Sequence, residues 1–140
     1  MSIITIVVLF IIYYLIRGRI MCPCPSTNNS IMCYRVEIWG LQINHLIFYT
    51  VIGFLYPRKF IIWQLLGIVW ELIEFIPTYY PRTLDYIGGC IQKDMINNYT
   101  INPIDRWLPR DKKHIWHPKL SDIALNLIGF YLGRYFSIYK

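Results

Sequence analysis

The sequence predicts an all-α integral membrane protein, a bundle of about four transmembrane helices that form a single membrane domain. Hydrophobic residues make up 56% of the 140 residues and charged residues only 16%, whereas soluble domains are roughly 25% charged. The apolar residues also lie in long blocks, separated by basic residues and prolines. This distribution favours a multi-pass membrane protein over a soluble globule.

The charge balance fits a membrane surface better than nucleic acid. The chain has 14 Lys and Arg against 8 Asp and Glu, for a net charge of +6. These basic residues sit between and beside the apolar blocks, where anionic lipid headgroups lie. The 12 tyrosines suit the aromatic belt of a membrane interface. We therefore expect no nucleic-acid partner.

The first predicted helix covers residues 3–21. Ile3–Ile16 is continuously apolar and is followed by Arg17 and Arg19. No basic region precedes this block and no small-residue cleavage site follows it, so it is typical of a signal anchor rather than a cleaved signal peptide. Its length approaches the roughly 20 residues that a membrane span needs.

The second and third helices are predicted at residues 41–56 and 60–76, joined by a tight turn. Pro57 ends the second helix and Pro77 stops the third, because proline disrupts a helix interior. The short connection makes the two helices antiparallel.

The last predicted helix covers residues 121–139 and follows a long polar loop at 79–120. Ser121 is a good N-cap residue, and the charge of Asp122 suits the positive end of the helix dipole. A loop this long in a small protein is usually functional or disordered.

Lys and Arg predict the orientation. If the N-terminus lies outside, ten basic residues fall on the cytosolic side and four on the other. This assignment places the loop at 79–120 in the cytosol. Two glycosylation sequons, beginning at Asn28 and Asn98, would then go unused, and a glycan on either would contradict the assignment.

The four cysteines are predicted to be free thiols in loops; they are Cys22, Cys24, Cys33 and Cys90. None forms a C-x-x-C pair, and His114 and His117 are not in zinc spacing with them. The C-x-C pair beside a membrane helix also suits palmitoylation. Whether disulfides form depends on the orientation.

Two carboxylates in the third apolar block call for a partner. Glu71 and Glu74 are three residues apart, so they share one face of a helix. A charged side chain at the bilayer centre costs roughly 2.5–3.5 kcal/mol on insertion scales. A cation, a proton or a metal would offset that cost.

Other polar residues are predicted to converge on the same membrane surface. His45 lies near the start of the second helix, and Asp122 and Asn126 lie four residues apart at the start of the fourth. Antiparallel neighbours bring these ends beside the end of the third helix. The carboxylate and amide oxygens of Glu71, Glu74, Asp122 and Asn126 suit Ca²⁺, Mg²⁺ or Mn²⁺ rather than zinc. A neutral His45 suits a general base.

Each of these residues also has a structural interpretation. Asp122 suits a helix start without any metal, His45 suits an interfacial residue bonded to a carbonyl, and Asn126 suits a hydrogen bond between helices. Gly129 and Gly133 form a small-xxx-small pair, which lets another helix approach closely. That helix could belong to a second copy, so a homo-oligomer is one expectation.

The pattern resembles the core of base-exchange phosphatidylserine synthases. The matching residues are His45, Trp70, Glu71, Leu72, Glu74, Trp116, Asp122, Asn126, Gly129 and Gly133. The resemblance implies that His45 is the catalytic base and that a Ca²⁺ is held by the carboxylates, with membrane phospholipid and a serine-like small molecule as partners. The resemblance covers roughly residues 39–133. The synthases of that family are several times longer than this chain.

Two spacings depart from that family. Here 47 residues separate Glu74 from Asp122, where the family has a short connection, and the Asp122-to-Asn126 interval is one residue shorter than in the family. The four-residue interval instead resembles VanZ-like small membrane proteins, whose biochemical function is poorly defined.

The sequence thus predicts a phospholipid headgroup-exchange enzyme resembling phosphatidylserine synthase. The alternative is a VanZ-like or other non-enzymatic membrane protein whose polar residues pack helices or bind a ligand. An ion-conducting oligomer ranks last, because only Gln64 and Thr50 continue a polar path along the other half of the helices.

Overall fold

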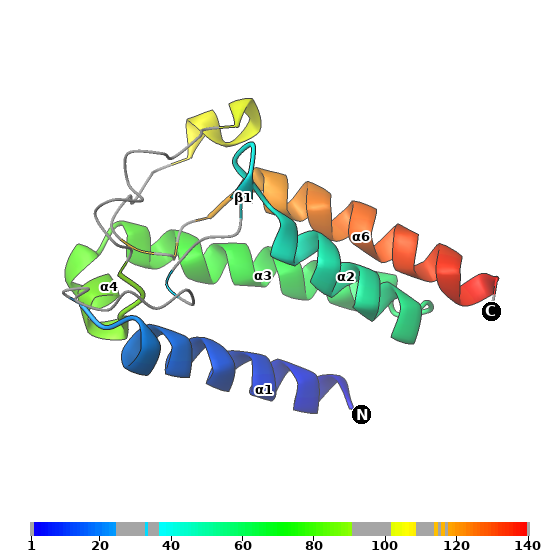
Figure 1. Cartoon of the computed structure of the whole chain (residues 1–140), viewed down its shortest axis with the longest axis horizontal. Helices are drawn as coiled ribbons and strands as arrows, with labels where there is room; N and C mark the ends of the chain where they lie inside the picture. Colours follow the sequence, from blue (N-terminus) through cyan, green and yellow to red (C-terminus); the bar gives the residue numbers. More distant parts are fainter. Residues whose placement is uncertain are drawn as a thin grey trace. The chain divides into compact units, whose positions relative to one another are not determined.

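The computed structural model describes residues 2–24, 33, 37–90, 102–108, 114, 116 and 118–139. Its secondary structure is mostly helical, which confirms the predicted all-α class. The chain divides into two compact units, whose elements are labelled in Figure 1. The helical unit comprises Val36–Ile76, Thr100–Pro109 and Pro118–Lys140, and the disulfide unit comprises Met1–Arg35, Pro77–Tyr99 and Arg110–His117.

Two helices of the helical unit pack with their backbones in close contact. They are α2 (Ile43–Leu55) and α6 (Leu120–Ile138), which run side by side in Figure 1. A Cβ atom added at Gly133 would collide with the carbonyl of Thr50, and one at Gly129 would meet the carbonyl of Leu46. The glycine pair is therefore used within the chain, against α2. Homo-oligomerisation stays a prediction, although this face of α6 is already covered.

The third helix of this unit, α3 (Phe60–Thr78), joins the other two through large side chains. The Tyr49 hydroxyl donates a hydrogen bond to the Trp63 carbonyl oxygen at 2.9 Å. The rings of Phe60 and Phe130 lie 5.3 Å apart, edge to face. Pro77 lies inside α3 rather than after it, because a proline in the last turn removes only one backbone hydrogen bond.

A two-stranded hairpin precedes α2, and the sequence analysis did not predict it. Strands β1 (Glu37–Ile38) and β2 (Leu41–Gln42) pair antiparallel. The two turn residues, Trp39 and Gly40, have φ angles of 52° and 77°, as a type I′ turn requires. Tryptophan rarely adopts a positive φ angle. The turn also lacks the Asn-Gly pair by which type I′ turns are usually recognised in a sequence. As a result α2 begins at Ile43 rather than at Leu41.

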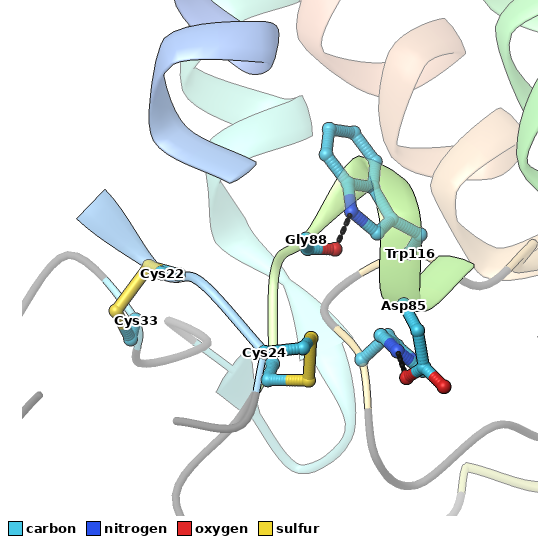
Figure 2. The surroundings of a disulfide bond; sticks show 8 residues. Cys22, Cys24, Cys33, Asp85, Gly88 and Trp116 are labelled. Atoms are coloured by element: carbon cyan, nitrogen blue, oxygen red, sulfur yellow. Dashed lines mark hydrogen bonds and ion pairs between the residues drawn. A yellow bond between two sulfur atoms is a disulfide. The ribbon is translucent and has the colours of Figure 1, made fainter. Parts of the chain in front are cut away.

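The disulfide unit contains α1 (Ile3–Ile16), which continues as the π-helix η1 (Arg17–Met21), and the short helix α4 (Pro81–Ile87). Disulfides join Cys22 to Cys33 and Cys24 to Cys90. Figure 2 shows both bonds. The prediction of free thiols is therefore wrong, and the same pairing leaves no cysteine for palmitoylation. Loop connectivity brings together residues that are far apart in sequence, which spacing alone does not reveal.

Among the described residues, two helices are long and apolar enough to cross a membrane. They are Ile3–Met21 and Phe60–Thr78. The predicted second span shrinks to the 13 residues of α2, and α6, with its buried polar residues, does not qualify as a span. Large apolar side chains are nevertheless exposed on α3, including Ile61 at 70% and Ile76 at 59%. Composition and exposure support association with a membrane.

The described residues of the predicted loop at 79–120 include two short helical elements. One is α4, and the other is the 3-10 helix η3 (Pro103–Trp107), which belongs to the helical unit. The sequons at Asn28 and Asn98 lie outside the described residues.

Candidate metal centre

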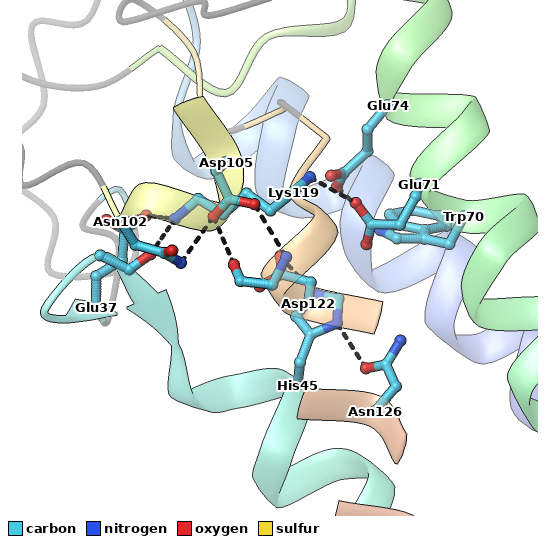
Figure 3. A network of polar contacts seen from close by, with 12 residues as sticks. Glu37, His45, Trp70, Glu71, Glu74, Asn102, Asp105, Lys119, Asp122 and Asn126 are labelled. Atoms are coloured by element: carbon cyan, nitrogen blue, oxygen red, sulfur yellow. Dashed lines mark hydrogen bonds and ion pairs between the residues drawn. The ribbon is translucent and has the colours of Figure 1, made fainter. Parts of the chain in front are cut away.

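Three of the predicted site residues meet inside the helical unit. His45 comes from the first turn of α2, Glu71 from α3, and Asp122 from the first turn of α6. Each offers one ligand atom, and these atoms all lie within 4.8 Å of one another. Figure 3 shows the three side chains directed toward the same region. Asn126, one turn further along α6, completes the group by contacting His45.

Asn126 determines how the imidazole of His45 is presented. Its Oδ1 lies 2.9 Å from His45 Nδ1. An amide oxygen only accepts hydrogen bonds, so Nδ1 carries the hydrogen and a neutral ring has its lone pair on Nε2. This is how a metal-binding or catalytic histidine is usually oriented by a neighbour. Asn126 thus positions His45, and its predicted role as a ligand stays a prediction.

The lone pair of His45 faces a carboxylate. His45 Nε2 lies 3.5 Å from Asp122 Oδ2, a distance too long for a good hydrogen bond. Two acceptors that face each other in a buried site repel each other. A cation or a proton between them removes this repulsion.

The two carboxylates have unused acceptor capacity. Asp122 is completely buried, and neither of its oxygens has a hydrogen-bond partner among the described residues. Glu71 Oε2 accepts a hydrogen bond from the Lys119 backbone N–H at 2.8 Å, but its Oε1 has no partner within the described part of the chain. Each unsatisfied buried polar atom costs about 1–3 kcal/mol. Three such oxygens beside one imidazole are what a cation site provides.

Glu74 lies outside this group. Its Oε1 accepts a hydrogen bond from Trp70 Nε1 at 2.9 Å, one turn back on α3. A residue three positions after Glu71 lies about 4.5 Å further along the helix axis. Sharing a helix face is therefore not sufficient to share a ligand sphere. The structure does not bring Glu74 to the cluster, and its predicted role as a ligand stays a prediction.

Among the described residues, one buried cation lies near the site and is already paired. Lys119 is 2% exposed, and its Nζ lies 2.6 Å from Glu37 Oε1 and donates to the Gly40 carbonyl oxygen at 2.9 Å. Asp122 interacts electrostatically with Lys119, but also with the carboxylates of Glu71, Asp105 and Glu37. Acidic groups thus outnumber the cation, which leaves room for a further positive charge.

The start of α6 is fixed by a residue that the sequence analysis missed. Asp105, in η3, accepts hydrogen bonds from the Ser121 N–H at 2.9 Å and from the Ser121 hydroxyl at 2.5 Å. The predicted N-cap, Ser121, therefore lies inside the helix, and Lys119 occupies the N-cap position. Asn102 holds Asp105 in place through a 3.0 Å hydrogen bond. The Asn-Pro dipeptide at 102–103 is a turn signal that could have indicated this element.

Other residues of the resemblance have different partners. Trp116 belongs to the disulfide unit, where its indole N–H donates to the Gly88 carbonyl oxygen at 2.8 Å. Trp70 supports Glu74, and Gly129 and Gly133 pack against α2.

A second set of metal-binding residue types occurs in the disulfide unit. Cys24, Cys90, Asp85 and His114 each place a ligand atom within 4.8 Å of the others. His114 thus meets two cysteines in space, which sequence spacing did not predict. The two sulfur atoms are joined to each other, however, and a disulfide lacks the thiolates that bind zinc.

No protein-family model, curated protein or solved structure matches this chain.

Proposed function

We propose that this chain is a multi-pass membrane enzyme that exchanges phospholipid headgroups with the help of a divalent cation. The observation that supports it most is the group of three buried carboxylate oxygens without hydrogen-bond partners in the described chain, on Glu71 and Asp122, next to His45. The choice of substrate follows the resemblance to base-exchange phosphatidylserine synthases.

The cluster fits a divalent cation by its chemistry. Carboxylate oxygens are the ligands that Ca²⁺, Mg²⁺ and Mn²⁺ prefer, and the neighbouring acidic residues outnumber Lys119. A cation bound here would neutralise the negative charge of a phosphodiester. Glu71 and Asp122 are the residues that would hold it. Ca²⁺ stays the first choice, with Mn²⁺ and Mg²⁺ as alternatives.

His45 would act as the general base. Its Nε2 takes the proton from the hydroxyl of a serine-like alcohol, whose oxygen attacks the phosphorus. The bond from phosphorus to the outgoing headgroup oxygen breaks, and Nε2 returns the proton to that oxygen. Asn126 keeps the Nδ1 hydrogen in place throughout. Protons and electron pairs balance, so no further reactant is required.

Labelled-serine incorporation into phospholipid tests this proposal in membranes that contain the full chain. We expect incorporation with Ca²⁺ and none in EGTA, with Mn²⁺ and Mg²⁺ added back in separate arms. His45→Ala should abolish turnover but retain most cation binding, whereas Asp122→Asn should lose both. Glu74→Gln is the matched control, because it is an equally buried carboxylate outside the cluster. If the wild-type chain is inserted in the membrane but incorporates no serine, the proposal of headgroup exchange is wrong.

The second candidate is a non-enzymatic membrane protein of VanZ-like type. The hydrogen bonds themselves favour it: His45 links α2 to α6, and Glu71 links α3 to the backbone just before α6. In that case the polar residues hold helices together. Asp122→Asn would then be tolerated or stabilising, because it removes a buried charge that lacks a partner. An increase in thermal stability without any cation effect would favour this candidate.

A further inference from the structure

The cross-links of the disulfide unit are integral to its fold. All four cysteines of the chain are paired, and Cys22, Cys33 and Cys90 are at most 1% exposed. The Cys22 carbonyl oxygen accepts hydrogen bonds from the backbone N–H groups of Gly89 at 2.7 Å and Cys90 at 3.2 Å. Figure 2 shows the segment that leaves η1 beside the segment that follows α4. The disulfides therefore fasten a contact that the backbone also makes.

Among the described residues, the disulfide unit buries only Leu84 and Trp116 as large apolar side chains, a small core to replace these bonds. Helix α1 buries none of its side chains in the described structure, and α4 is only 7 residues long. Tight backbone packing provides part of the contact, since a Cβ atom at Gly18 would lie 2.8 Å from the Ile87 carbonyl oxygen. Small units without a sufficient core typically rely on disulfides.

We infer that the segments carrying these cysteines, which follow η1 and α4, lie on the oxidising side of the membrane. Protein disulfides persist in the endoplasmic reticulum lumen, the periplasm and outside the cell, and are rare in the reducing cytosol. The disulfide unit would thus face away from the cytosol. This orientation is the reverse of the one that the Lys and Arg count predicts.

The charge count is a weaker indicator than the covalent bonds. It is a statistical bias that treats all basic residues of a loop alike. Lys119 is one of the ten basic residues counted on the cytosolic side, yet it is buried and paired with Glu37. Arg19 also counts, and its guanidinium lies 4.5 Å above the ring of Tyr86. Disulfides, in contrast, require an oxidising compartment to form and persist.

One consequence concerns the proposed enzyme. Helix α3 carries Glu71 and ends at Thr78, three residues before α4 begins at Pro81. The end of α3 that carries Glu71 therefore leads into the disulfide unit, and the cation would come from the oxidising compartment. This consequence rests on the proposed function, whereas the orientation itself does not.

Thiol accessibility in sealed microsomes that contain the full chain tests the orientation. The chain is first treated with a membrane-impermeant polyethylene-glycol maleimide, without reductant. A second sample is reduced with membrane-permeable dithiothreitol, freed of reductant, and then labelled with microsomes either sealed or opened by detergent. We expect labelling of all four cysteines only after reduction and opening.

Labelling in sealed microsomes, with or without reduction, would overturn the inference, because it would place the cysteines on the cytosolic side. So would thiols that react without reduction in opened microsomes, or zinc bound by Cys24, Cys90, Asp85 and His114. The wild-type chain suffices for this measurement, so misfolded variants do not confuse it. Cys33→Ser serves as a calibration, since it should leave one free thiol, Cys22, which a denaturing detergent makes reactive without reduction.

Discussion

The two units of the chain each gather a histidine and acidic or sulfur ligands, but they satisfy these groups differently. In the disulfide unit the sulfur atoms of Cys24 and Cys90 are joined, and His114 Nε2 lies 3.0 Å from Asp85 Oδ1. In the helical unit His45 faces Asp122 at 3.5 Å, and three carboxylate oxygens have no partner among the described residues. Proximity of metal-binding residue types is thus not sufficient for a site. The unmet bonding capacity distinguishes the two clusters.

The comparison implies that the disulfide unit depends on its covalent bonds. The two disulfides should contribute different amounts to its free energy of unfolding. Cys24–Cys90 spans 66 residues and Cys22–Cys33 spans 11. By loop-closure entropy, removing the longer link should cost about 4 kcal/mol and removing the shorter about 3 kcal/mol. We expect Cys24→Ser with Cys90→Ser to lower the melting temperature more than Cys22→Ser with Cys33→Ser. Thermal unfolding in detergent measures both, and equal losses would mean that loop length does not govern the effect.

The helical unit should depend on its carboxylates for cation binding. Replacing an outer hydrogen-bond partner of a metal ligand typically costs 10–100-fold in affinity, so loss of a ligand should cost more than about 100-fold. We expect Asp122→Asn and Glu71→Gln to show this loss in Mn²⁺ binding, measured by electron paramagnetic resonance on the purified chain. Glu74→Gln should bind like wild type. A loss in Glu74→Gln equal to that in Asp122→Asn would place Glu74 among the ligands after all.

How far the sequence could predict this arrangement depends on the kind of contact. Long apolar runs indicated α1 and α3 within a few residues, because length and hydropathy are local properties. The approach of His45 to Asp122 followed from antiparallel neighbours joined at the same side. The pair of Lys119 with Glu37 could not be predicted, because Glu37 belongs to a hairpin that the sequence pattern did not indicate. Disulfide partners were equally hidden, since four cysteines allow three pairings.

Asn126 supports the cluster of the helical unit through its contact with His45. Asn126→Ala should free the imidazole to rotate and lower turnover by about 10–100-fold, the range typical of such supporting residues. Cation affinity should stay close to that of wild type, because Glu71 and Asp122 are unchanged. Gln64→Ala is the control, because Gln64 donates a hydrogen bond to the Asn126 backbone carbonyl oxygen, at 3.4 Å, and not to the Asn126 side chain. An unchanged turnover in Asn126→Ala would show that His45 needs no support to face Asp122.

The smallest expected effect tests whether the helical unit relies on individual noncovalent bonds. The Tyr49 hydroxyl is buried and donates to the Trp63 carbonyl oxygen, which connects α2 to α3. Tyr49→Phe removes this donor, leaves the ring in place, and should lower the free energy of unfolding by about 1 kcal/mol. Tyr135→Phe changes the same group at a 55% exposed position of α6 and should have little effect. The expected loss is smaller than that for removing either disulfide. If Tyr49→Phe lowered the free energy of unfolding as much as removing Cys22–Cys33 does, the helical unit would depend on single hydrogen bonds as strongly as the disulfide unit depends on its cross-links.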